Sequence, residues 1–293
     1  MLVDLVQTTT RDGVRLDGMF RAPTARAPAV PVDGFCLVHG TGGNFYGSSL
    51  LGAFGERLLA LGCAVLTVNT RGHEGISSAV TDRGGRRQGA AYEVVDDCRH
   101  DLAAWLAWLR QRAGPRVGLV GHSMGAVKCL YALAQEPQPG VACVLALSPP
   151  RLSYAWFCAG PKAAEFLQTY QEAERSVGTG RPDALLDVKF PLPFVITAAG
   201  YVEKYGPEER YNFLRFVGGV PCPTLITLGA LEVESNAAFR GSPEALRPLT
   251  ERYPWVQVRT VAGADHFYTN ARDDVIAQAE AWLRTLPVTP ATA

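Results

Sequence analysis

The chain has 293 residues, of which 47% are apolar and 19% are charged, and its 28 Lys and Arg residues balance its 28 Asp and Glu residues. This composition is that of an ordinary folded globular protein and is far from that of a disordered chain. Because the chain has no net positive charge that would drive binding to DNA or RNA, nucleic acid is not expected as a partner.

The sequence shows neither a targeting signal nor a membrane span. The first residues lack a basic stretch followed by an apolar one, and no run approaches the roughly 18 apolar residues that a transmembrane helix needs. The cysteines are odd in number and show no metal-ligand spacing, which indicates buried reduced thiols. We therefore expect a cytoplasmic protein without membrane contact, and the sequence leaves its oligomeric state open, with a homodimer as one option.

The predicted elements begin with a β-hairpin and continue as alternating strands and helices. Residues 4–22 alternate apolar and polar side chains around a turn at Arg11, Asp12 and Gly13, which predicts the hairpin. Later apolar runs do not alternate, as is typical of strands buried on both faces in a parallel sheet covered by helices. The expected strands and helices occupy residues 35–39, 50–61, 64–69, 93–112, 117–120, 124–135 and 141–147 in turn. This order predicts an α/β fold.

The alternation stops at residues 148–150 and resumes with an apolar run at residues 224–228. So long a connection without structure is improbable inside a compact domain, and the segment is rich in aromatic residues. We expect a helical insertion over residues 149–220 that caps one end of the sheet, between core segments 1–148 and 221–293. A helix from Ser242, a strand over residues 256–261 and a helix over residues 273–286 complete the core.

The most informative motif joins an expected strand to an expected helix through Gly121, Ser123 and Gly125. A G-x-S-x-G sequence in this context is typical of a nucleophile elbow, in which the serine occupies a strained turn and its hydroxyl is lifted above the sheet edge. Side chains at the two glycine positions would collide where strand and helix pass closely. Ser123 is therefore the candidate nucleophile, and a glycine-rich turn with an incidental serine is the alternative.

With these motifs the chain resembles the serine hydrolases of the α/β-hydrolase fold superfamily from Asp4 to Leu286. The supporting motifs are His39-Gly40-Thr41-Gly42-Gly43 after an early strand and Ala264-Asp265-His266-Phe267 near the end. The resemblance implies a mostly parallel central sheet flanked by helices, a helical cap after the sixth strand, and a nucleophile, an acid and a histidine in that order. Since the chemistry requires no metal and the chain contains no phosphate-binding or dinucleotide motif, no cofactor is expected.

A serine hydroxyl needs a base to accept its proton, and His266 is the candidate. Of the five histidines, only His266 lies between the last expected strand and the last helix, where the family places its base. His39 is better suited to bracing the loop that holds the oxyanion, and His122 to packing. His73 and His100 have structural interpretations.

The acid that orients the histidine is expected after the strand at residues 224–228. Glu232 there resembles the acid of the family's Gly-x-x-Asp, with Glu in place of the commoner Asp, and Glu234 is the alternative. Asp265 is better suited to capping a loop, because consecutive side chains do not face one another. The expected triad is Ser123, His266 and Glu232.

The oxyanion formed during acyl transfer needs N–H donors that are already in position. We expect one donor to be the Met124 amide, at the N-terminus of the helix that follows Ser123. The other is expected to be the Thr41 amide, with the Gly42 amide as the alternative.

The remaining charged residues have structural interpretations. Arg71 is expected to form an ion pair, and Lys128 to extend its charge to the surface. The arginine cluster of residues 82–89 is interpreted as a solvated loop or, alternatively, as a grip on an anionic substrate tail. The cluster comprises Arg83, Arg86 and Arg87, with Glu93, Asp96 and Asp97 as the nearby balancing acids.

Phe45, Tyr46 and Trp156 suggest an apolar or aromatic substrate pocket, unless these rings only bury the cap against the sheet. The sequence thus predicts hydrolysis of a carboxylic ester of a small or medium hydrophobic acyl substrate through an acyl-enzyme. Thioesters, amides and activated C–C bonds are alternatives for the same machinery. A ligand-binding protein without catalysis is the alternative from another class. In either class the partner is a small molecule.

Overall fold

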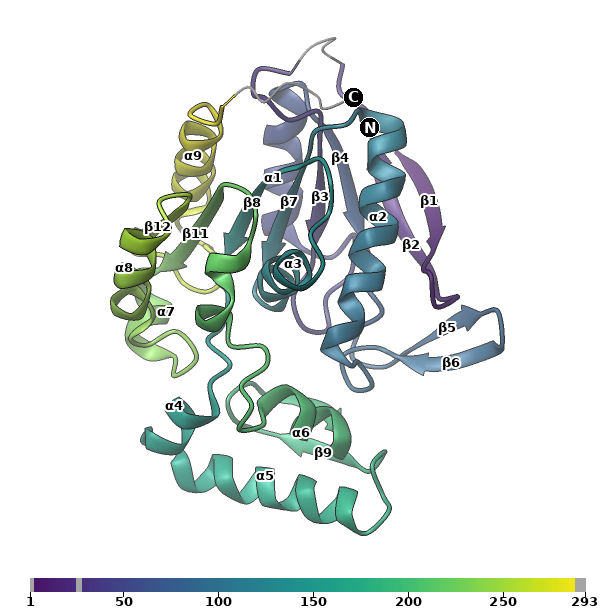
Figure 1. Cartoon of the computed structure of the whole chain (residues 1–293), viewed down its shortest axis with the longest axis vertical. Coiled ribbons are helices and arrows are strands. Elements are labelled where there is room, and N and C mark those ends of the chain that lie inside the picture. Colours follow the sequence, from purple (N-terminus) through teal and green to yellow (C-terminus); the bar gives the residue numbers. More distant parts are fainter. Residues whose placement is uncertain (1–2, 25–27, 288–293) are drawn as a thin grey trace.

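The structure is a computed structural model that describes residues 3–24 and 28–287. In this part of the chain the central sheet has eight strands in the order β1-β2-β4-β3-β7-β8-β11-β12 (Figure 1). Their bounds are Asp4–Thr9 (β1), Arg15–Arg21 (β2), Gly34–Val38 (β3), Ala64–Val68 (β4), Val117–His122 (β7), Val141–Leu147 (β8), Thr224–Gly229 (β11) and Val256–Val261 (β12). The hairpin of β1 and β2 is antiparallel, and from β4 to β12 all neighbours are parallel. The expected hairpin and mostly parallel sheet are confirmed.

Helices cover both faces of this sheet. The core helices are α1 (Ser49–Ala60), α2 (Cys98–Ala113), α3 (Met124–Gln135), α8 (Ser242–Arg252) and α9 (Arg272–Leu283). Helices α1 and α9 share one apolar core with the sheet, whereas α2, α3 and α8 belong to the core on the other face. Every residue of β3, β4, β7 and β11 is buried, which explains why their sequences are apolar without alternation. Within residues 3–24 and 28–287, no helix combines the length and the apolar character needed to cross a membrane.

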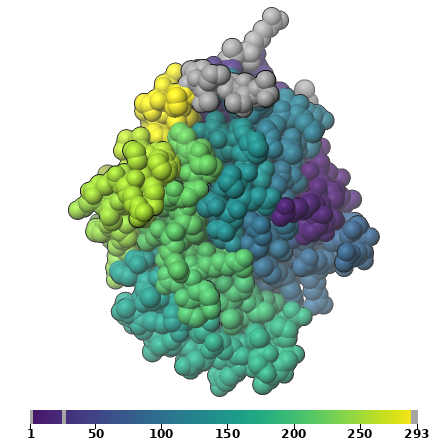
Figure 2. Space-filling model, in the orientation of Figure 1, coloured from purple at the N-terminus to yellow at the C-terminus, as the bar shows by residue number. Residues whose placement is uncertain are grey.

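The insertion between β8 and β11 forms a small lobe beyond the carboxyl ends of the strands (Figure 1). Its elements are α4 (Tyr154–Ala159), α5 (Ala163–Gly178), β9 (Leu185–Val188), β10 (Phe194–Thr197) and α6 (Ala198–Tyr205). Figure 2 shows the teal and green atoms of this lobe covering the lower end of the molecule. The antiparallel pair of β9 and β10 departs from the expectation of a purely helical insertion. Strands this short carry too little alternation to be recognised from sequence.

The arginine cluster also differs from expectation, because it lies on a second hairpin rather than on a loop. Strands β5 (Ser77–Thr81) and β6 (Gly84–Gln88) pair in antiparallel register, and the hairpin projects from the core below α2 (Figure 1). Arg83, Arg86 and Arg87 are exposed on this hairpin.

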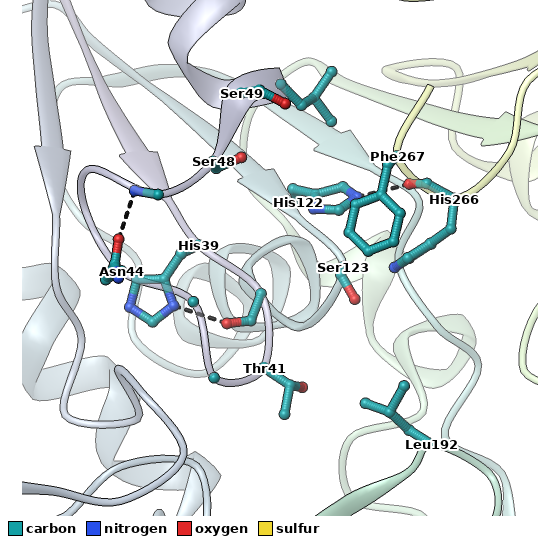
Figure 3. A pocket seen from close by; sticks show the side chains of 15 residues that line it. His39, Thr41, Asn44, Ser48, Ser49, His122, Ser123, Leu192, His266 and Phe267 are labelled. Carbon is teal, nitrogen blue, oxygen red and sulfur yellow. Dashed lines mark hydrogen bonds between the residues drawn. The ribbon is translucent and has the colours of Figure 1, made fainter. Parts of the chain in front are cut away.

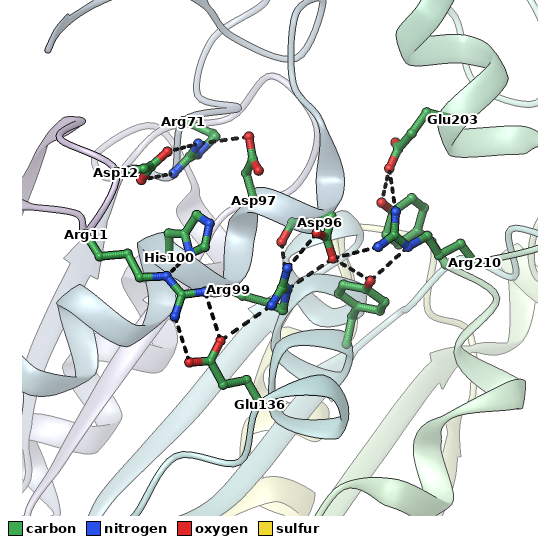
Figure 4. A network of polar contacts seen from close by, with 12 residues as sticks. Arg11, Asp12, Arg71, Asp96, Asp97, Arg99, His100, Glu136, Glu203 and Arg210 are labelled. Carbon is green, nitrogen blue, oxygen red and sulfur yellow. Dashed lines mark hydrogen bonds and ion pairs between the residues drawn. The ribbon is translucent and has the colours of Figure 1, made fainter. Parts of the chain in front are cut away.

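Arg71 holds three separate segments together, as Figure 4 shows. Its side chain is 3% exposed and forms ion pairs with Asp12, Asp97 and Asp101 at 2.8 to 2.9 Å. Burial raises the pKa of Asp12, but hydrogen bonds from Arg71 and Thr10 outweigh burial and leave this pKa well below its usual value. The expected structural ion pair of Arg71 is present.

Two expectations about neighbouring charges are wrong. Lys128 does not reach the surface: it is fully buried and forms an ion pair with the buried Glu93. Asp96 pairs with Arg99 and Arg210, so the acids near the arginine cluster balance other cations. The physical reason is that a buried charge is retained only beside a counter-charge, whereas exposed arginines need none.

Candidate active site

Ser123 sits at the turn between β7 and α3, with φ of 56° and ψ of −125°. This left-handed backbone is strained for a residue with a side chain. The turn is fixed to the sheet by the Ser123 amide, which donates to the Leu147 carbonyl at 2.8 Å. A Cβ at Gly121 would overlap the backbone of Gly125, and one at Gly125 would overlap the Val38 carbonyl. The glycines of the motif are therefore required by close backbone approach.

His266 lies on the loop between β12 and α9, and its ring is held by Glu232. The distance from Nδ1 of His266 to Oε2 of Glu232 is 2.7 Å. Because an ionised carboxylate only accepts, Nδ1 carries the proton and Nε2 is left with its lone pair. Figure 3 shows the His266 ring directed towards the Ser123 hydroxyl, with both side chains on the wall of one pocket.

Glu232 belongs to the short helix α7 (Ala230–Ser235), whereas Glu234 on the same helix is exposed. Of these two glutamates, Glu232 is the one that forms a hydrogen bond with His266. Its other oxygen, Oε1, accepts from the Gly229 amide at 2.7 Å and from the Ser148 hydroxyl. These donors hold the carboxylate in one orientation.

Behind Glu232 lies a buried polar network that was not predicted from the sequence. The Tyr268 hydroxyl lies 2.8 Å from Oγ of Ser148 and 2.7 Å from Oγ1 of Thr227. All three residues are fully buried. The available signal was that Ser148 directly follows the apolar strand β8 and that Thr227 interrupts the apolar strand β11. These two residues can be paired only once the order of the strands in the sheet is known.

His122 holds the loop that carries His266. Its Nε2 donates to the His266 carbonyl at 2.8 Å. Burial lowers the pKa of His122 to about 3, so the ring stays neutral near neutral pH. Asp265 accepts from the Phe267 and Thr269 amides, which is the capping role expected of it. The loop therefore presents His266 from a fixed backbone.

The Thr41 and Met124 amides lie close to Ser123. Among the described residues, no hydrogen bond from either amide to another residue is found. Met124 is the first residue of α3, and the loop before Thr41 comes so close to the serine that a Cβ at Gly40 would lie 3.0 Å from Cβ of Ser123. That these two amides are the oxyanion donors stays a prediction.

His39 fixes the peptide that carries the Thr41 amide. The Thr70 amide donates to Nε2 of His39 at 3.1 Å, so the proton is on Nδ1, which donates to the Gly40 carbonyl at 2.8 Å. Burial lowers the pKa of His39 to about 3 and keeps the ring neutral. Since C=O and N–H of one peptide point in opposite directions, this bond sets the direction of the Thr41 N–H. These contacts fit the bracing role expected of His39.

The pocket containing Ser123 and His266 has a volume of about 410 Å³. Its apolar wall is formed by Leu50 of α1, Leu192 of the insertion and Phe267. Among the described residues that line this pocket, Phe45, Tyr46 and Trp156 are absent, contrary to expectation.

Each of the three rings has another environment. Tyr46 is 69% exposed and packs edge to face on Phe45, with ring centroids 5.1 Å apart. The Trp156 indole donates to the Ala237 carbonyl at 2.9 Å and packs beside Arg151. The exposed arginines of the β5–β6 hairpin are not part of this pocket wall either. In the part of the chain that the structure describes, no group of three or more His, Cys, Asp or Glu side chains is arranged to hold a metal ion.

Comparisons with known proteins identify the family. The profile described as "Alpha/beta hydrolase family" matches residues 37–284. No curated protein sequence matches the chain.

Three similar solved structures show the same fold. The Pyrococcus furiosus esterase Pf2001 has a TM-score of 0.63 at 17% identity, with 97% of this chain and 91% of that chain covered. Est1E from Butyrivibrio proteoclasticus, solved with ferulic acid, has a TM-score of 0.64 at 17% identity, with 95% and 98% covered. The alpha/beta hydrolase GrgF from Penicillium sp. sh18 has a TM-score of 0.67 at 16% identity, with 97% and 98% covered. By its sequence profile and by its fold, this chain belongs to the alpha/beta hydrolase family.

Proposed function

We propose that the protein is a serine hydrolase that cleaves carboxylic esters of small or medium hydrophobic acyl substrates. In this proposal Ser123 is the nucleophile, His266 the general base and Glu232 the acid that orients it. The observation that carries the proposal is the 2.7 Å bond from His266 to Glu232 in the same pocket as a serine on a strained elbow. This arrangement leaves Nε2 of His266 free to accept the serine proton.

In the first half of the reaction, Nε2 of His266 accepts the Ser123 proton while Oγ bonds to the ester carbonyl carbon. The carbonyl oxygen becomes an anion, and the Thr41 and Met124 amides donate to it. When the C–O bond to the leaving group breaks, His266 returns its proton to that oxygen. An alcohol departs and the acyl group remains on Ser123.

In the second half, a water molecule takes the place of the alcohol. His266 accepts one water proton as the water oxygen bonds to the acyl carbon, and the same two amides stabilise the second oxyanion. Collapse breaks the bond to Oγ, and the proton on His266 passes to Ser123. The carboxylic acid leaves and the enzyme is restored.

Ester hydrolysis is favoured over the other reactions by one of the structural neighbours, the Pyrococcus furiosus protein Pf2001, which is named as an esterase. The test is hydrolysis of p-nitrophenyl acetate and butyrate by the wild-type protein and by Ser123→Ala. We expect turnover by the wild type and a loss of at least about a thousandfold in kcat for Ser123→Ala.

The control is Ser78→Ala, which removes an exposed hydroxyl on β5 and should hydrolyse both esters at the wild-type rate. Panels of thioesters and amides with the same acyl groups are run in parallel. Faster cleavage of either panel than of the esters would replace the ester assignment, and turnover retained by Ser123→Ala would reject the mechanism.

A further inference from the structure

A second compartment adjoins the pocket of Ser123. It has a volume of about 400 Å³, within the range of small-molecule sites. Its lining residues are Thr41, Gly42, Gly75, Ile76, Ala90, Leu192, Pro193, Phe194 and Val195. Thr41, Gly42 and Leu192 also line the pocket of Ser123, so the two spaces meet at these residues. One wall comes from the start of β10 and the residues just before it, and the opposite wall from the segment before β5.

The second compartment is apolar. None of its described lining residues carries a charge. Ile76 is 54% exposed, and Leu192 and Val195 are each 39% exposed. Large apolar side chains gathered around one hollow mark a surface that binds an apolar group. Its position beside the candidate nucleophile indicates that this group belongs to the substrate.

The chemistry at Ser123 and His266 decides which end of the substrate enters the second compartment. In the tetrahedral intermediate the reacting carbon carries Oγ of Ser123, the oxyanion, the leaving-group oxygen and the acyl chain. The leaving-group oxygen has to lie near Nε2 of His266, because it receives the proton from that atom. The second compartment is reached past Thr41 and Leu192, and neither His266 nor Phe267 is among its lining residues. The chain that enters it is therefore attached on the side away from His266.

We infer that this compartment binds the acyl chain of the substrate, an uncharged aliphatic or aryl group longer than acetyl. The inference rests on the proposed function and adds where the acyl chain binds and that this chain is longer than acetyl. Full burial of one methylene increases binding about fourfold, and in a half-open compartment we expect about twofold for each added methylene. The value of kcat/KM should therefore increase along an acyl series and not along an alcohol series.

The experiment compares p-nitrophenyl acetate, butyrate, hexanoate and octanoate with methyl, butyl and octyl acetate. For the wild type we expect the octanoate-to-acetate ratio of kcat/KM to be about tenfold or more. Val195→Trp fills the compartment and should bring this ratio close to one, while the ratio of octyl to methyl acetate keeps its wild-type value. The matched control is Leu185→Trp on the neighbouring strand β9, whose side chain is exposed and does not line the compartment. It should preserve both ratios.

Circular dichroism establishes that each variant is folded, and Ile76→Trp on the opposite wall replaces Val195→Trp if the latter is not. A change in the alcohol series alone would assign the compartment to the leaving group and overturn the inference. Acyl ratios that stay at the wild-type value in both tryptophan variants would also overturn it. In those two cases ester hydrolysis persists. A folded wild type that hydrolyses none of the esters would instead reject the proposed function, and the inference with it.

Discussion

Among single residues, Glu232 has the most demanding position, because it must be charged, oriented and almost completely buried at once. Its side chain is 2% exposed, and both carboxylate oxygens have donors: His266 on one, Gly229 and Ser148 on the other. Hydrogen bonds to an ionised group are stronger than those between neutral groups. Three donors therefore compensate for the water that burial removes.

Glu232→Gln should cripple turnover, whereas Glu234→Gln should not. A Gln amide at position 232 is able to donate to Nδ1 of His266, which would place the imidazole proton on Nε2 and leave no base facing Ser123. We expect kcat to fall by about 10²–10⁴ for Glu232→Gln and by less than about twofold for Glu234→Gln. Steady-state hydrolysis of p-nitrophenyl butyrate measures both. A larger loss for Glu234→Gln would transfer the role to Glu234.

Some residues of the site could be predicted from short motifs, whereas others depend on contacts between distant segments of the chain. Ser123, His266 and Glu232 could be predicted because each follows a strand in the order of a known motif. Ser148, Thr227 and Tyr268 could not, since their contacts arise only when β8 and β11 become neighbours. The prediction of an aromatic pocket did not match the lining of the pocket, because a ring near the motif in sequence, such as that of Tyr46, faces solvent in the fold.

At the scale of elements, the elbow depends on the close approach of α3 to the ends of β3 and β7. Gly125→Ala should destabilise the fold by about 1–3 kcal/mol, because the added Cβ overlaps the Val38 carbonyl, which cannot move without distorting β3. Urea unfolding measures the free energy of unfolding of each variant. Gly52→Ala is the matched control: this glycine is also in a helix, and its Cβ would meet nothing within 4 Å. It should stabilise by about 0.5–1 kcal/mol. Equal effects of the two substitutions would contradict this account of the elbow.

The core strands could be predicted because burial on both faces leaves a continuous apolar run, as in β3 and β11. The two small hairpins could not. Strand β6 has four exposed residues out of five, including two arginines, so its composition is that of a solvated loop. Strands β9 and β10 have four residues each and lie in a segment rich in aromatic residues. Buried helices explain such a run of aromatic residues equally well, and helices were therefore predicted there.

For the whole molecule, two buried histidines predict a loss of stability in mild acid. Burial lowers the pKa of His39 and of His122 to about 3, whereas an unfolded histidine has a pKa of about 6.5. Below pH 6.5 the unfolded chain binds protons that the native state excludes, so the stability is complete above pH 6.5 and declines as the pH falls. Between pH 7.5 and 5.5 each histidine should remove about 1.4 kcal/mol from the free energy of unfolding.

Urea unfolding at these two pH values measures this decline, and His122→Gln should reduce it by the share of one histidine. The Gln side chain retains an N–H donor for the His266 carbonyl while removing the titrating group. A decline of the same size in His122→Gln, or no decline in the wild type, would contradict the assignment of these histidines as buried and neutral.

We propose that the fold makes the Ser123 hydroxyl a nucleophile by placing it before a His266 that Glu232 orients. Intact-protein mass spectrometry after incubation with a fluorophosphonate, followed by peptide mapping, measures this reactivity. We predict one covalent adduct per chain, on Ser123, that is absent in Ser123→Ala and forms about 10²–10⁴ times more slowly in His266→Gln. A folded wild-type protein that remains unmodified, or whose adduct maps to another residue, would show that Ser123 is not the nucleophile.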